Sequence, residues 1–193
     1  MCFASHLGTS MCQEIPTAIY TSPFMADIQT GMKIVENIPL GVRWNIEPGL
    51  AGFIPDGTEA PKLDINLGYS TVMSVDHINR VLGKESKEEF YRRISCVLSK
   101  LDFSLSQSTM IVADADVIDA IIQEKVRCGQ RLRAHEVQRL NTHIPCLSIQ
   151  HFDISSKGEW RPSAASIPGL LSECDLINTV PNTSFLVRIN DGI

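Results

Sequence analysis

The sequence has no long apolar run and no excess of basic residues. Its longest apolar stretches, such as residues 110–113, are a few residues long, whereas a membrane-spanning helix needs about 20. The formal net charge is −5, so the molecule as a whole does not present the basic surface of a nucleic-acid binder. We therefore expect a soluble protein without a membrane span.

Familiar catalytic signatures are also missing. The sequence contains no P-loop, no dinucleotide-binding glycine motif, and no zinc-protease, serine-hydrolase or zinc-deaminase motif. Their absence weakens the case for an enzyme without excluding one, and we predict no cofactor. The 6 cysteines are widely and irregularly spaced, and no basic start with an apolar core marks a secretion signal. Reduced thiols and a cytoplasmic location are therefore expected.

The first part of the chain is rich in strand patterns. Apolar and polar residues alternate over residues 42–46 and again over 63–67, as in half-buried strands. Residues 32–35 suggest a third, less regular strand. We therefore predict a β-rich half over about 15–73.

The later part of the chain alternates between helix and strand patterns. Ser86 and Glu89 have the spacing of a capping box, which predicts a helix over 86–101. Ser74 is placed to cap a shorter helix that ends near Gly83. Further helices are predicted over 117–128, 130–141 and 169–177, and further strands near 108–113, 146–152 and 184–189. Strands first and mixed elements later, without strict alternation, indicate an α+β fold with three to five helices.

The 193 residues suit one large domain. We predict an N-terminal arm over 1–15 and a single domain over 16–193. Because chain ends usually fray unless they are tied down, an ordered arm favours packing against a partner or another subunit.

Three aspartates follow the apolar strand predicted at 108–113. Asp114, Asp116 and Asp119 lie where carboxylates can hold Mg²⁺ for a phosphate-bearing substrate. The seven residues 111–117 are similar to the nucleophile motif of the haloacid dehalogenase family, although too little chain follows them for that fold in its usual order. The alternative interpretation is that one aspartate caps the next helix and the others favour its positive end.

Cys96 is the candidate nucleophile among the cysteines. It projects away from the apolar stripe of its helix, and Arg92, Arg93 and Lys100 lie within four residues of it. Neighbouring cations favour the reactive thiolate, but catalysis also needs a base that only tertiary contact could supply. The alternative is a tolerated cysteine on a solvated face.

The region 125–139 concentrates positive charge on this acidic chain. The predicted binding residues are Arg127, Arg131, Arg133, His135 and Arg139. Such a face suits phosphate, nucleic acid or an acidic protein surface, and the lack of interleaved aromatic residues disfavours nucleic acid. A solvated helix face with local salt bridges is the alternative.

These patterns favour a non-enzymatic assembly or protein-interaction subunit, part of a homo- or hetero-oligomer with a protein partner. The alternatives are a hydrolase or transferase with Cys96 as nucleophile, and a Mg²⁺-dependent phosphate-handling enzyme that uses Asp114 and Asp116. We predict no zinc site, because the cysteines and histidines do not form two closely spaced ligand pairs.

Overall fold

We analysed a computed structural model of the protein. It describes residues 15–38, 41–101, 103, 108–125, 151–155 and 157–163. The predicted arm, the helices over 130–141 and 169–177, and the strand at 184–189 lie outside the described residues, apart from Ile15. Among the described residues, no helix is long and apolar enough to cross a membrane.

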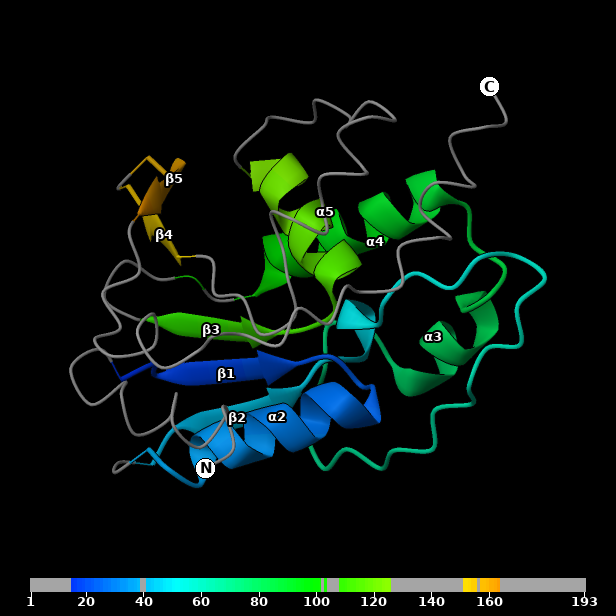
Figure 1. Ribbon diagram of the computed structural model, residues 1–193, viewed down its shortest axis with the longest axis horizontal. Coiled ribbons are helices and arrows are strands. Elements are labelled where there is room, and N and C mark those ends of the chain that lie inside the picture. Colours follow the sequence, from blue (N-terminus) through cyan, green and yellow to red (C-terminus); the bar gives the residue numbers. More distant parts are fainter. Residues whose placement is uncertain are drawn as a thin grey trace, which may run out of the picture.

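Three parallel strands form the centre of the fold (Figure 1). Strand β1 (Ala18–Thr21) lies between β2 (Arg43–Ile46) and β3 (Thr109–Val112). Thr21, the last residue of β1, is in register with the last residue of each neighbour. The carboxyl ends of all three strands therefore lie level at one edge of the sheet.

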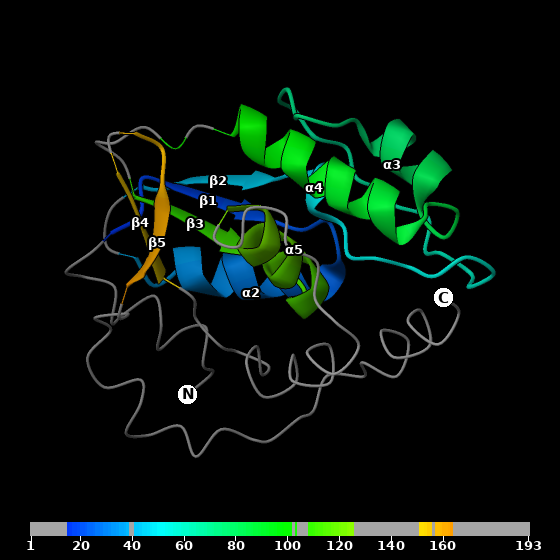
Figure 2. The same ribbon diagram turned by 90° about the horizontal axis from the view of Figure 1, so that it is seen from above.

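Helices cover both faces of this sheet (Figures 1 and 2). On one face, α2 (Met25–Val35) packs Ile34 against Ile19 of β1. On the other face, α4 (Lys87–Lys100) and α5 (Ala115–Lys125) pack together over Tyr20. This alternation of strand side chains between two apolar clusters follows from the two-residue period of a β-strand.

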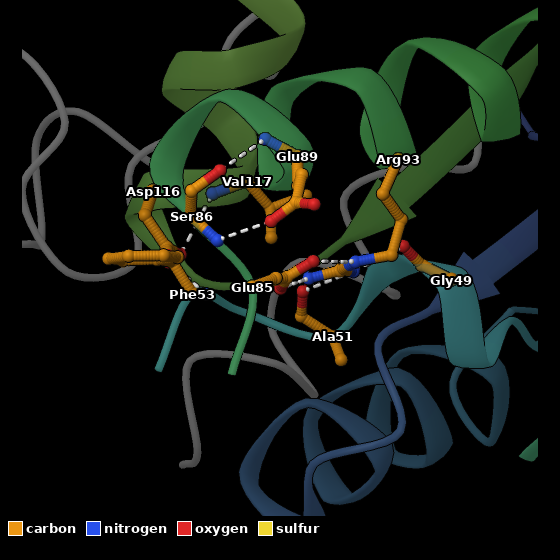
Figure 3. Close-up of polar contacts among 9 residues, drawn as sticks. All are labelled: Gly49, Ala51, Phe53, Glu85, Ser86, Glu89, Arg93, Asp116 and Val117. Atoms are coloured by element: carbon orange, nitrogen blue, oxygen red, sulfur yellow. Dashed lines mark hydrogen bonds and ion pairs between the residues drawn. The ribbon is translucent and has the colours of Figure 1, made fainter. Parts of the chain in front are cut away.

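The fold is α+β, as the sequence predicted, with a second, antiparallel pair of strands beside the parallel sheet. The capping box of α4 is confirmed: Ser86 Oγ accepts from Glu89 N at 3.2 Å, and Glu89 Oε2 accepts from Ser86 N at 2.8 Å (Figure 3). Ser74 likewise caps α3 (Val75–Val81). The strand predicted near 108–113 is β3.

Two of the strands predicted in the first half are wrong. Residues 32–35 belong to α2, whose buried residues Asp27, Gly31 and Ile34 recur at the helical period rather than the strand period. Residues 63–67 are irregular. The backbone of Leu63 bonds to the Asn79 side chain and not to a neighbouring strand. Its N–H donates to Asn79 Oδ1, and its carbonyl accepts from Asn79 Nδ2, both at 2.8 Å.

The segment after residue 150 forms a small hairpin. Strand β4 (His151–Ile154) overlaps the end of the strand predicted at 146–152, and it pairs with β5 (Trp160–Ser163), for which no strand was predicted. Trp160 stacks edge-on against Phe103 and lies beside Phe152. These aromatic contacts attach the hairpin to the main core. The turn-forming residues of this segment gave no sign of them in the sequence.

A buried ion pair fixes the segment that follows β2. Arg93 of α4 and Glu85 are each 5% exposed. The Arg93 guanidinium donates to both Glu85 carboxylate oxygens, to the Gly49 carbonyl at 2.7 Å and to the Ala51 carbonyl at 2.8 Å (Figure 3). The fork geometry of arginine allows this combination, which joins α4 to the short helix η2 (Pro48–Leu50) and to the residue after it.

Glu47 holds the other side of the same segment. Its buried carboxylate accepts backbone hydrogen bonds from Gly49 and Met73 at 3.0 Å and from Val72 at 2.8 Å. Glu47 and Arg93 thus bind the backbone of η2 and its neighbours from two sides, which fixes the course of this segment.

We expect Arg93→Met to lower the free energy of unfolding by about 3–5 kcal/mol, because it leaves the Glu85 charge buried without its partner. Chemical denaturation monitored by circular dichroism measures this change. Adding Glu85→Leu should recover a large part of the loss. The exposed neighbour Arg92 is the control, and Arg92→Met should change stability by less than about 0.5 kcal/mol. Equal losses for the two arginines would contradict the assignment.

We expect Gly31→Ala to destabilise the protein by about 1–3 kcal/mol through overpacking. A Cβ at Gly31 would lie 2.3 Å from Thr21 Cγ2 and 3.1 Å from Trp44 Nε1, so α2 would have to move away from the sheet. Gly68→Ala is the matched control, since no atom lies within 4 Å of its added Cβ. Thermal melts of both variants measure the difference in stability. A Gly31→Ala variant as stable as the control would show that α2 does not pack this closely against the sheet.

Candidate functional site

The carboxyl edge of the parallel sheet collects acidic side chains from segments far apart in the sequence. Beyond the ends of β1 and β3 the chains stay paired, because Ser22 N donates to the Val112 carbonyl at 2.9 Å. Asp27 lies in the first turn of α2, which follows β1, and Asp114 and Asp116 follow β3. Ligands of open parallel sheets bind at this edge, where neighbouring connections leave in different directions.

Asp27 is a buried acid without a full set of partners. It is 8% exposed, and its Oδ2 atom has no hydrogen-bond partner. The pKa of Asp27 is raised to about 7, mainly by burial and also by the nearby Asp114 and Asp116 charges, while the hydrogen bond from the Ser22 hydroxyl acts in the opposite direction. Asp27 therefore combines a raised pKa with a buried oxygen that lacks a hydrogen-bond partner.

Asp116 is held by backbone amides on both of its carboxylate oxygens. Oδ1 accepts from Val117 N at 2.8 Å, and Oδ2 accepts from Phe53 N, in the segment after β2 (Figure 3). The pKa of Asp116 is raised to about 6, mainly by burial and also by Asp114, while the Phe53 and Val117 amides and Arg93 oppose the rise. Asp116 thus links the end of β3 to the segment fixed by Arg93.

Asp114 is the most open of the three acids. Its side chain reaches the surface, yet the protein around it removes enough water to raise its pKa. The backbone of Gly52 runs directly beside it: a Cβ at Gly52 would lie 2.8 Å from Asp114 Oδ2 and 3.4 Å from Asp116 Oδ1. A glycine therefore allows the segment after β2 to approach both acids closely.

The expectation that one aspartate caps the helix after β3 agrees in position with Asp114, although no side-chain cap is found for α5 among the described residues. The helix begins at Ala115, so Asp114 stands directly before it, and the Asp114 carbonyl accepts from Ile118 N at 3.1 Å. Asp119 has a different role from the other acids. It is buried between α4 and α5, where its Oδ2 accepts from the Tyr91 hydroxyl at 3.1 Å and from Gln123 Nε2 at 2.6 Å.

The acids do not enclose a preformed metal cage. Within the described ranges, no group of three or more histidine, cysteine, aspartate or glutamate side chains is arranged to hold a metal ion. This arrangement agrees with mutual repulsion between carboxylates that share a partly dehydrated site. Any cation here would be held by fewer protein ligands, with water or substrate oxygens completing its coordination.

Cys96 lies half-buried on α4 as a free thiol, and one of its predicted neighbours has another role. Arg93, which was expected to favour the thiolate, instead donates to Glu85 and to the segment after β2. In the part of the chain that the structure describes, no hydrogen bond joins the Cys96 thiol to a histidine. The prediction of a Cys96 nucleophile remains a prediction, with two of its three expected cations left.

The basic face predicted at Arg127, Arg131, Arg133, His135 and Arg139 lies outside the described residues. Comparison with known proteins adds no assignment: no protein-family model matches the chain, and no curated protein shows significant similarity to it.

Sequence reasoning missed Asp27. The signal was present, because the apolar residues 18–20 are followed by Ser22 and Pro23 and then by a buried stripe at Asp27, Gly31 and Ile34. That order indicates a strand, a turn and a helix. The strand pattern seen at 32–35 concealed the helix and with it the position of Asp27 at the edge of the sheet.

We expect Asp27→Asn to stabilise the protein at about pH 8 by roughly 2–4 kcal/mol, given about 1.4 kcal/mol per pKa unit. The pKa of Asp27 rises from 3.8 to about 7 on folding. Between these values the folded state binds more protons than the unfolded state, so wild-type stability falls as pH rises, and this contribution is constant above about 7. Asparagine stays neutral over this range, so the variant does not lose this stability as pH rises.

Denaturant titrations across this pH range measure the difference, which should shrink toward about pH 4. Asp64→Asn removes an exposed carboxylate in an irregular segment and serves as the control with little change. An Asp27→Asn protein that is destabilised equally at every pH would show that the ionised carboxylate is satisfied in the fold.

Proposed function

We propose that this chain is an enzyme that uses a divalent cation of the Mg²⁺ class to act on a phosphate-bearing substrate. The observation that supports it best is the gathering of Asp27, Asp114 and Asp116 at the carboxyl edge of the parallel sheet, with the pKa of each raised by burial. Clustered acids with raised pKa values are typical of functional sites.

The donor set fits such a cation. All three side chains offer carboxylate oxygens, the ligands that Mg²⁺ prefers, and Mg²⁺ is usually bound by one or two carboxylates, several waters and substrate phosphates. The missing three-ligand cage is therefore compatible with Mg²⁺. When bound, the cation would offset phosphate charge and polarise a phosphoryl oxygen.

The rest of the site holds these acids in place. Arg93 fixes the segment after β2, whose Phe53 amide donates to Asp116. The lack of a side chain at Gly52 lets this segment lie directly beside Asp114. Each contribution positions a carboxylate rather than contacting a substrate, so the site is preorganised by the fold.

Other predicted roles rest on residues or contacts beyond these observations. An assembly or protein-interaction role, with an acidic partner surface, depends on the arm 1–15 and on the basic face over 125–139, and it stays a prediction. Catalysis by Cys96 and a cytoplasmic location also stay predictions.

We test the function with a panel of nitrophenyl phosphate mono- and diesters assayed in Mg²⁺, in Mn²⁺ and in EDTA. We expect turnover that requires the cation and falls by about 100-fold or more in Asp114→Asn, because loss of a carboxylate ligand removes the cation from the reacting phosphate. Thermal melts with and without the cation provide a readout independent of substrate, since a bound cation stabilises the folded state.

Cys96→Ser and Asp64→Asn are the matched controls and should keep full activity. If Cys96→Ser abolishes activity and the wild-type activity does not depend on a cation, the result favours the thiol as nucleophile instead. A protein whose melting temperature responds to neither Mg²⁺ nor Mn²⁺, and which turns over none of the esters, contradicts the proposal.

A further inference from the structure

Asp114 and Asp116 lie two residues apart in the sequence, but their carboxylate oxygens are not equally available to a cation. Asp116 already accepts a backbone N–H on each oxygen, from Phe53 and from Val117. Asp27, in contrast, is nine-tenths buried with Oδ2 lacking any partner. A buried acceptor without a hydrogen bond carries a desolvation cost that is unusual in folded proteins unless a ligand satisfies it.

We propose that the divalent cation is held between Asp27 and Asp114, with Asp116 as a positioning residue rather than a ligand. This inference rests on the proposed function and specifies its metal site. Asp27 lies in the first turn of α2, which follows β1, and Asp114 follows the adjacent strand β3, whose Val112 carbonyl accepts from Ser22 N.

The accessibility of the two carboxylates after β3 supports this pairing. Asp114 is exposed, and the backbone of Gly52, which carries no side chain, lies beside its Oδ2 atom. Both oxygens of Asp116, in contrast, already accept backbone hydrogen bonds. Asp114 is therefore the better placed of the two to share a cation with Asp27.

The close approach of Gly52 gives Asp116 its separate role. Gly52 and Phe53 form one wall of the site, and the Phe53 amide is bound to Asp116. Asp116 thus ties the wall to the start of α5. Removing this carboxylate should loosen the wall while leaving both proposed ligands in place.

The test is Mn²⁺ binding to the full chain at one fixed pH, measured by electron paramagnetic resonance of free Mn²⁺. We expect Asp27→Asn and Asp114→Asn each to raise the Mn²⁺ dissociation constant by about tenfold or more, the scale seen when a metal site loses a supporting group. Asp116→Asn should have a smaller effect, and Asp64→Asn should match the wild type.

A second pair of variants covers the case in which an asparagine variant is poorly folded. Thiolates prefer soft metals over Mn²⁺, so Asp27→Cys should gain Cd²⁺ affinity relative to the wild type, which controls for the native cysteines. Asp116→Cys should show no such gain.

The outcomes separate the two proposals. If Asp114→Asn and Asp116→Asn abolish Mn²⁺ binding while Asp27→Asn and Asp27→Cys bind as the wild type does, the pairing is wrong and the proposed function stands. If wild-type protein binds no Mn²⁺, both are wrong. Loss in Asp27→Asn together with Cd²⁺ binding by Asp27→Cys establishes Asp27 as a ligand.

Discussion

The ion pair between Arg93 and Glu85 is the constraint on which the site depends. Both groups are buried, so either charge alone would be costly, and together they are satisfied only with the Gly49 and Ala51 carbonyls in position. The pair thereby fixes the segment after β2, whose Phe53 amide reaches Asp116. A core interaction of α4 thus determines the geometry of acids that follow a different strand.

The parallel arrangement of the strands explains why the acids meet at all. Antiparallel strands would place the ends of β1 and β3 on opposite edges, whereas the observed register brings Thr21 and Val112 side by side. Asp114 lies two residues beyond the end of β3, and Asp27 lies in the first turn of α2, the helix that follows β1. The protein around them raises the pKa of both acids, and the proposed cation would offset this cost.

The two halves of the site differ in how much the sequence revealed. Asp114 and Asp116 follow a clear apolar strand and were recognised as candidates, because the local pattern is sufficient to place them at a strand end. Asp27 was not, since its role depends on which strands are neighbours. The availability of each oxygen was also invisible, because the amide that occupies Asp116 Oδ2 comes from Phe53, 63 residues away.

The sequence by itself determined the local elements with strong signals: the capping box at Ser86 and Glu89, the strand over 109–112 and the α+β class. Such features depend on interactions within a few residues. Tertiary structure alone decided the strand order, the irregular course of 63–67 and the hairpin partner of β4. These depend on contacts between distant segments, such as Asn79 with Leu63 and Trp160 with Phe103, which no local pattern encodes.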